Sequence, residues 1–410
     1  MIRTPAGPPQ PPGREPRRTR FVLISVTAVV LIGLNLRAGI ASAGPLFHDL
    51  QDLLGYGALA AALLPTVPVL CFAVAGAATA WLVRRVGLEP AIALALLLLT
   101  GGLAARAVDS TLMLMAGTVI GMSGLAVCNV AMPSYIRQHH TDRAATMTAV
   151  YTVSMTIGAT TAAAVAVPIA GGLGSPTLGL AAWAVPAAVA FAVFLPLAVR
   201  SRVADDWAAR QGVPYVSPWP LLKTRKGLLF TSLFAAQAFL AYGVLGWYPH
   251  ILVSRGLDAT TAGLMLGLMQ LVGIPTMMVL LAMAGRPWLL RTAFMITCGA
   301  SLGGYVVLLF APVDWAVGTS ILMGFGFCVF PLLMLLISRS GSTSAETTAL
   351  STLAQSLGYL GAALGPFGLG LMNGMLGDWT AALVVVLVVS AVQAVLSHRV
   401  TAAPRQAAGS

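Results

Sequence analysis

Twelve long apolar runs, each bounded by charged or turn residues, constrain the fold of this chain more than any other feature. Hydrophobic residues make up 58% of the 410 positions and charged residues only 9%, whereas soluble domains carry about 25% charged residues. So few charges cannot cover a globule of this length with polar surface, which excludes a water-soluble protein. Roughly 20 apolar residues cross a bilayer as a helix, so we expect each run to span a membrane.

The runs fall into two sets of six, separated by a polar connection that is rich in basic residues and proline. The sequence therefore predicts an all-α integral membrane protein with two pseudo-symmetric six-helix bundles, at residues 21–199 and 227–397. We expect a cytoplasmic linker at 200–226, a disordered cytoplasmic tail at 1–20 and a second cytoplasmic tail at 398–410. The predicted spans are 21–46, 58–83, 90–107, 111–134, 145–169, 177–199, 228–251, 260–283, 291–311, 316–338, 347–371 and 379–397.

The positions of lysine and arginine predict the orientation of the chain. If both termini are cytoplasmic, every basic residue except Arg37, Arg106 and Arg255 lies on the inner side. Basic residues near span ends are retained in the cytoplasm, so we expect a multi-pass protein of a cell membrane with both termini inside. This placement accounts for the net charge of +11 as a membrane feature, and no nucleic-acid partner is expected.

The four cysteines lie inside apolar runs without paired ligand spacing, so neither a metal site nor a cofactor is predicted. No Asp or Glu falls within a predicted span. Many proton-coupled transporters titrate a carboxylate in the membrane. Coupling to protons would here need a histidine, a proton carried by the substrate or a group at a loop edge.

Two weak internal matches relate the two sets of spans. Gly158 in the fifth span corresponds to Gly358 in the eleventh, and Gly55 before the second span corresponds to Gly256 before the eighth, at offsets of 200 and 201 residues. A common offset together with the division into six and six indicates two parallel repeats. Transporters built in this way rock their halves about a site near the midplane.

Arg37 is the single charge in the interior of a predicted span, away from the span ends; it lies roughly 24 Å along the first helix and beyond its midpoint. A cation at that depth costs on the order of 2.5–3.5 kcal/mol on insertion scales. One interpretation is a guanidinium fork that holds an anionic or planar polar substrate. The alternatives are an arginine that reaches outward to the lipid headgroups or one capped by carbonyls of a broken helix.

Several uncharged polar side chains near the middle of the spans are further candidates for substrate contact. Each amide is as well explained by a hydrogen bond between helices, so both interpretations stay open. Gln355 and Tyr359 are four residues apart and share a helix face, whereas Asn35 and Arg37 point in different directions. The candidates are Asn35, Gln237, Tyr242, Gln270, Gln355 and Tyr359.

Trp247, Tyr248 and His250 gather toward the outer end of the seventh span. Aromatic residues at that depth usually belong to the interfacial belt, which we favour over an outer gate, although Trp247 and His250 are candidates for a gate and His250 for a titrating group. His139 and His140 lie beside basic residues and are predicted to occupy a solvated loop.

Short sequence blocks resemble a known family. Residues 35–37 (NLR), 44–46 (GPL) and 64–70 (LPTVPVL) are similar to the opening of the cyanate/nitroimidazole permease (CynX/NimT) family of the major facilitator superfamily, and residues 246–249 (GWYP) and 330–332 (FPL) support the match. The resemblance implies a secondary transporter of the bacterial inner membrane for a small polar or anionic solute, such as cyanate or a nitroheterocycle. Arg37 is then the arginine of the family's first-span block.

The function predicted from the sequence is alternating access to a central site that contains Arg37, by a monomer whose partners are a small solute and the bilayer. The alternative is a proton-coupled drug or multidrug exporter, because residues 168–172 (PIAGG) resemble an exporter motif. A membrane enzyme is disfavoured, because the inner loops bring together only His139, His140 and Asp142 as potential catalytic groups.

Overall fold

The computed structural model describes residues 15–200, 219–283, 286–341 and 343–402, and these ranges form helices without strands. Eleven helical stretches in the described ranges are long and apolar enough to cross a membrane, and the 33-residue helix α16 is a twelfth long helix. The predicted all-α membrane fold is confirmed. The predictions for residues 1–14, 201–218 and 403–410 lie outside the described residues.

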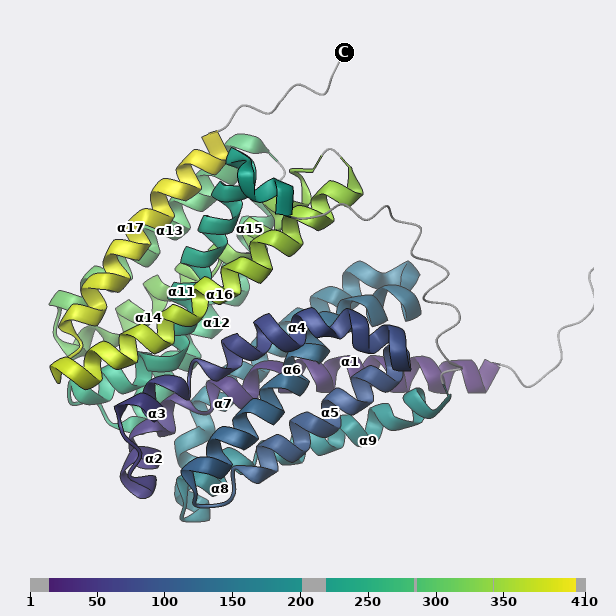
Figure 1. Ribbon diagram of the computed structural model, residues 1–410, viewed down its shortest axis with the longest axis horizontal. Helices are drawn as coiled ribbons and strands as arrows, with labels where there is room; N and C mark the ends of the chain where they lie inside the picture. Colours follow the sequence, from purple (N-terminus) through teal and green to yellow (C-terminus); the bar gives the residue numbers. More distant parts are fainter. Residues whose placement is uncertain (1–14, 201–218, 284–285, 342, 403–410) are drawn as a thin grey trace, which may run out of the picture.

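The N-terminal half is a bundle whose six predicted spans are all present (Figure 1). The short amphipathic helix α2 after the first span was not predicted. The helices are α1 (Glu15–Ala41), η1 (Gly44–Leu46), α2 (Phe47–Leu54), α3 (Ala58–Leu63), α4 (Val67–Val86), α5 (Leu88–Ala105), α6 (Thr111–His139), η2 (Thr141–Arg143), α7 (Ala144–Leu173), α8 (Pro176–Ala181) and α9 (Ala184–Arg200).

The C-terminal half repeats this plan with a second bundle of six spans. Its helices extend into the regions predicted as linker and tail: α11 starts at Arg225 and α17 ends at Ala402. The helices are η3 (Trp219–Lys223), α11 (Arg225–Ser254), α12 (Ala259–Met283), α13 (Pro287–Phe310), η4 (Val313–Trp315), α14 (Ala316–Gly326), α15 (Val329–Ser338), α16 (Ser344–Leu376) and α17 (Thr380–Ala402).

Three spans are interrupted by a turn that begins four residues before a proline. A proline has no N–H to donate, and its ring clashes with the carbonyl four residues earlier. Prolines inside α6, α7 and α12 leave those helices continuous, so the breaks also depend on local packing. The turns begin at Leu64, Ala182 and Phe327, before Pro68, Pro186 and Pro331.

The two bundles meet at one end of the molecule and diverge toward the other (Figure 1). We call the end where α1 begins and α17 ends the termini face, and the opposite end, with the α1–α2 and α11–α12 connections, the far face. Across the halves, α7 packs on α12, α16 packs on α3 and α4, and η1 contacts α11 and α12. These contacts join the halves at the far face.

Glycines allow the close approaches at this junction. A side chain at Gly44 would touch the carbonyl oxygen of Leu245, and one at Gly246 would touch the ring of Pro65. Gly263 on α12 lies in the same way against the carbonyl of Ala163 on α7. At these three positions the halves approach each other backbone against small residues, while larger side chains of both halves, such as Phe47 and Trp247, share one buried apolar cluster.

Within the N-terminal half, Gly158 on α7 packs directly against α1. A Cβ atom at this position would overlap the carbonyl oxygen of Leu34, whereas a Cβ at Gly171 on the same helix would have no neighbour within 4 Å. The α1–α7 contact positions Arg37, so the fit at Gly158 bears on the site described below.

We expect Gly158→Ala to destabilise the protein by roughly 1–3 kcal/mol, because the added methyl overpacks the helix pair. Gly171→Ala is the matched control and should unfold at the wild-type temperature or slightly above it, since alanine favours the helix. Thermal unfolding in detergent measures both. Equal melting temperatures for the two variants would contradict the packing described for α1 and α7.

Candidate functional site

Arg37 lies on α1 near the junction of the halves, and its side chain is half-buried. Its charge interacts electrostatically with the phenol groups of Tyr151 on α7, Tyr242 on α11 and Tyr359 on α16. Helices of both halves therefore surround the guanidinium. Among the described residues, none forms a hydrogen bond or an ion pair with it.

Aromatic rings from both halves complete the surroundings of Arg37. Phe72 on α4 stacks on Tyr359 with ring centroids 5.9 Å apart and an interplanar angle of 23°. Tyr242 lies 6.1 Å from Phe72 and 6.2 Å from Tyr359, measured between centroids. We call Arg37, Phe72, Tyr151, Tyr242 and Tyr359 the central site.

The chemistry of the central site suits an anion or a flat polar solute. A guanidinium presents five N–H donors in a planar fork that matches paired oxygen acceptors. The phenol oxygen of Tyr151 is buried and has no partner among the described residues, so it is available to donate a hydrogen bond. Stacked aromatic rings add a surface for a planar group. Tyr151 was missed in the sequence, where it is one tyrosine inside an apolar run.

Two of the amides named from the sequence bind neighbouring helices of their own half. The side-chain N–H₂ of Asn35 donates to the carbonyl oxygens of Leu31, at 2.8 Å, and Pro186, at 3.1 Å. Gln237 accepts a hydrogen bond from Gln393 on α17, and both glutamines are buried. The structure does not bring Asn35 and Gln237 into the central site.

Among the described residues, Gln270 and Gln355 belong neither to the central site nor to a contact between two helices of one half. Gln270 on α12 is buried, and its Nε2 has no partner among the described residues. It follows Gly263 by seven positions, so it lies on the helix face that meets α7. Gln355 donates to the hydroxyl of Ser351, at 2.8 Å, and is half-buried one turn from Tyr359. Neither lines the small cavity between the halves, so a role for either in substrate contact stays a prediction.

The interfacial-belt interpretation of Trp247 is wrong, because its side chain is only 4% exposed at the far-face junction. The indole N–H donates to the carbonyl oxygen of Pro366, at 2.7 Å, and the ring lies 5.6 Å from that of Phe47 in the other half. Tyr248 is also buried and lies 2.7 Å from the hydroxyl of Ser320. His250 is half-buried, with its ring 5.7 Å from Trp247.

Sequence reasoning also misplaced polar groups at the termini face. Helix α5 begins at Leu88, so Glu89 lies within a span and is 8% exposed, against the expectation of no carboxylate there. Glu89 pairs with His139 at 2.7 Å. Ser25 lies 2.9 Å from the hydroxyl of Tyr135 and 2.8 Å from Nε2 of His140. The prediction that both histidines are solvated loop residues is therefore wrong, because each has a side-chain partner.

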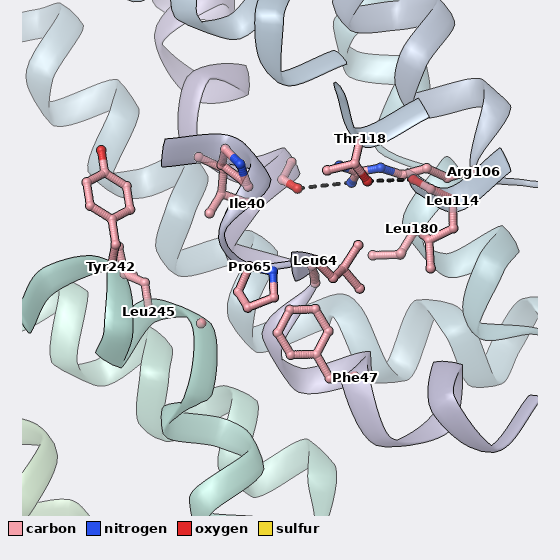
Figure 2. A pocket seen from close by; sticks show the side chains of 14 residues that line it. Ile40, Phe47, Leu64, Pro65, Arg106, Leu114, Thr118, Leu180, Tyr242 and Leu245 are labelled. Carbon is pink, nitrogen blue, oxygen red and sulfur yellow. Dashed lines mark hydrogen bonds between the residues drawn. The ribbon is translucent and has the colours of Figure 1, made fainter. Parts of the chain in front are cut away.

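Arg106, for which the sequence predicts only a place on the outer side of the membrane, is buried within the protein. It caps the C-terminal end of α5 and is only 2% exposed. Its Nη1 donates to the carbonyl oxygen of Gly39, at 3.1 Å, while its Nε has no partner among the described residues. It lines a small cavity between the halves (Figure 2). The sequence signal was a solitary basic residue on the side that has almost none.

Two bundles of membrane-spanning helices that meet along a common junction are the architecture of a class of multi-pass membrane transporters. The sequence profile of the Major Facilitator Superfamily matches residues 26–366. The chain belongs to this superfamily, and it is therefore a transporter and not an enzyme. The arrangement of two six-helix bundles predicted from the sequence is the fold of this superfamily.

Three relatives resemble the chain over most of its length. It is 30% identical to the uncharacterized transporter YycB of Bacillus subtilis (strain 168), with 88% of this chain and 89% of that protein covered. It is 29% identical to the 2-nitroimidazole transporter of Escherichia coli (strain K12), covering 92% and 95%. It is 26% identical to the cyanate transport protein CynX of the same strain, covering 86% and 90%.

Solved structures share the fold. The crystal structure of a D-xylose-proton symporter superposes with a TM-score of 0.75 at 13% sequence identity, covering 95% of this chain and 100% of the symporter. The similarity to the cyanate/nitroimidazole permeases expected from residues 35–70 is confirmed by the two relatives that carry these names.

Proposed function

We propose that this protein moves a small anion or a planar polar solute across the membrane by alternating access around the central site. The observation that carries the proposal is Arg37: a cation at the junction of the halves, without a counterion among the described residues and within electrostatic reach of three tyrosines. A solute that supplies paired acceptor atoms would occupy the guanidinium and accept hydrogen bonds from the phenols.

The energetics of the cation link solute binding to movement of the halves. An arginine in the bilayer interior costs several kcal/mol unless a partner offsets the loss of water. Bound anion would neutralise Arg37 and allow the halves to close over it on the termini face. Because Tyr151 belongs to one half and Tyr242 and Tyr359 to the other, binding at Arg37 favours states in which both halves contact the solute.

The names of two relatives support this class of solute. One relative is named for 2-nitroimidazole and another for cyanate. A nitro group and a cyanate ion both present acceptor atoms on a small, flat or linear frame. The aromatic faces of Phe72 and Tyr359 suit such frames better than they suit a branched or strongly hydrated solute.

We place the termini face in the cytoplasm of a bacterium, with the protein in the inner membrane and acting as a monomer. The bias of Lys and Arg toward this face supports the orientation. Arg106 and Arg255, which lie toward the far face, are both bound to backbone carbonyls, of Gly39 and Leu308 respectively. In this orientation the arrangement of the bundles corresponds to an inward-open state.

We expect Arg37→Ala to fold but to lose transport, and Arg37→Lys to transport at least about tenfold more slowly, because a point charge lacks the planar fork. Uptake of cyanate and of 2-nitroimidazole into proteoliposomes measures both. Gln237→Ala is the control and should keep the wild-type apparent affinity, since Gln237 bonds Gln393 within its own half. Wild-type rates for Arg37→Ala would remove Arg37 from the solute path.

We further propose that Trp247 and His250 close the far face. Trp247 links α11 to the carbonyl of Pro366 and packs against Phe47. His250 lies between the rings of His48 and Trp379, at 6.2 Å and 5.5 Å. Protonation of both histidines would place like charges on opposite halves.

Trp247→Ala should populate a state that is open at the far face, because it removes the ring contact with Phe47 across the halves. Spin labels on Leu59→Cys and Met375→Cys, at two exposed far-face positions, report the separation by pulsed dipolar spectroscopy. Trp315→Ala, which removes an exposed tryptophan, is the control. A distance distribution unchanged by Trp247→Ala would exclude this tryptophan as a gate.

The proton-coupled exporter remains the second candidate, and Glu89 is the observation that favours it. Its carboxylate is buried beside His139 and could carry a proton, although it lies at the end of a span and away from Arg37. We expect solute flux in proteoliposomes to persist without a pH gradient, because the described residues of the central site include no carboxylate. Flux that requires the gradient and is lost in Glu89→Gln would favour the exporter instead.

A further inference from the structure

Arg106 has an environment that its packing alone does not explain. The guanidinium has five N–H donors, yet only the bond from Nη1 to Gly39 is formed among the described residues. Nε is buried without a partner, and the side chain is 2% exposed. A buried donor without a partner lowers the stability of the folded protein by about 1–3 kcal/mol. A bound ligand that accepts hydrogen bonds from Arg106 would remove this cost.

The cavity beside Arg106 lies between the halves. Figure 2 shows Arg106, Thr118 and Leu180 on one side and Tyr242 and Leu245 on the other, with Pro65 between them and Phe47 below. The first set belongs to the N-terminal half and Tyr242 and Leu245 to α11 of the C-terminal half. No acidic side chain is among the described residues that line it. A cation in apolar walls attracts an anion strongly, because the local dielectric is low.

The cavity and the central site are neighbours along α1. Gly39, whose carbonyl holds Arg106, is two residues beyond Arg37, roughly 3 Å further along the helix axis toward the far face. Tyr242 contributes to both places. A solute that moves from the far face toward Arg37 would meet Arg106 first.

Two helix ends make the buried charge tolerable while leaving it unneutralised. Arg106 follows the last residue of α5, and Gly39 belongs to the last turn of α1. The C-terminal end of a helix carries a partial negative charge that stabilises a cation. These partial charges position the guanidinium, but they occupy few of its donors.

We propose that Arg106 is a second anion-binding group, which receives the solute from the far face and passes it to Arg37. The proposal rests on the proposed function, because the ligand is the small monovalent anion of the central site. In the present state Leu245 and Gly246 of α11 form part of the cavity wall. Separation of the halves at the far face would withdraw this wall and expose Arg106.

The test compares apparent affinities for cyanate from the two faces, in right-side-out and inside-out membrane vesicles. Arg106→Gln keeps an amide donor for Gly39 but loses the charge. It should raise the KM for cyanate from the far face by about ten- to a hundredfold and leave the KM from the termini face within about twofold of wild type. Arg106→Lys, which keeps the charge, should restore much of the far-face affinity.

A second variant tests the cavity without removing Arg106. Leu114 is buried and lines the cavity, so Leu114→Glu places a carboxylate where the solute would bind. The ion pair should preserve the melting temperature while far-face uptake of cyanate falls. Leu114→Gln is the uncharged control, with a smaller effect on uptake.

The outcomes separate this proposal from the proposed function. If Arg106→Gln changes neither KM, or lowers the melting temperature and affects both faces equally, Arg106 is only a structural cation and the subsite is rejected. In that case Arg37→Lys still impairs transport from both faces. If the wild-type protein does not transport cyanate or 2-nitroimidazole at all, it is the function proposed for Arg37 that fails.

Discussion

A chain that crosses a hydrocarbon layer must satisfy every backbone N–H and C=O within the protein, and the rest of this structure depends on that constraint. It accounts for the uninterrupted series of helices and for the way in which their breaks are confined. The turns at Leu64, Ala182 and Phe327 each precede a proline by four residues. The carbonyl left without a helical hydrogen bond is therefore the one to which the proline has no N–H to donate. Breaks of this kind bend a span without exposing a long stretch of backbone.

The same constraint applies to charged side chains, and the protein meets it in three ways. Glu89 is paired with His139 at the termini face. Arg106 is held by one carbonyl and two helix ends, with donors left over. Arg37 has no protein partner among the described residues and only phenols nearby. The two arginines whose donors are not fully used are the charges that lie between the halves, whereas the paired carboxylate lies away from their junction.

The junction between the halves combines close backbone contacts with contacts between larger side chains. Gly44, Gly246 and Gly263 lie against backbone carbonyls or a proline ring. Trp247 adds a hydrogen bond to Pro366 and a contact with Phe47, which tie three helices together, and Phe72 stacks on Tyr359 across the halves. Transporters of this superfamily are built from two such bundles.

The sequence by itself determined the helical class, the twelve spans and the division into halves, and it singled out Arg37 as a charge in the interior of a span. Hydrophobicity and charge along one segment are local properties, and membrane insertion depends on them directly. Tyr242 and Tyr359 were named as candidates from the sequence, and the structure places both near Arg37. Only the tertiary structure decided that Asn35 binds Pro186, that Gln237 binds Gln393, and that Tyr151 and Arg106 face the junction. These outcomes depend on how each helix is rotated about its axis and on partners as many as 156 residues away. Rotation and partner choice are set by packing against other helices, which no single segment encodes.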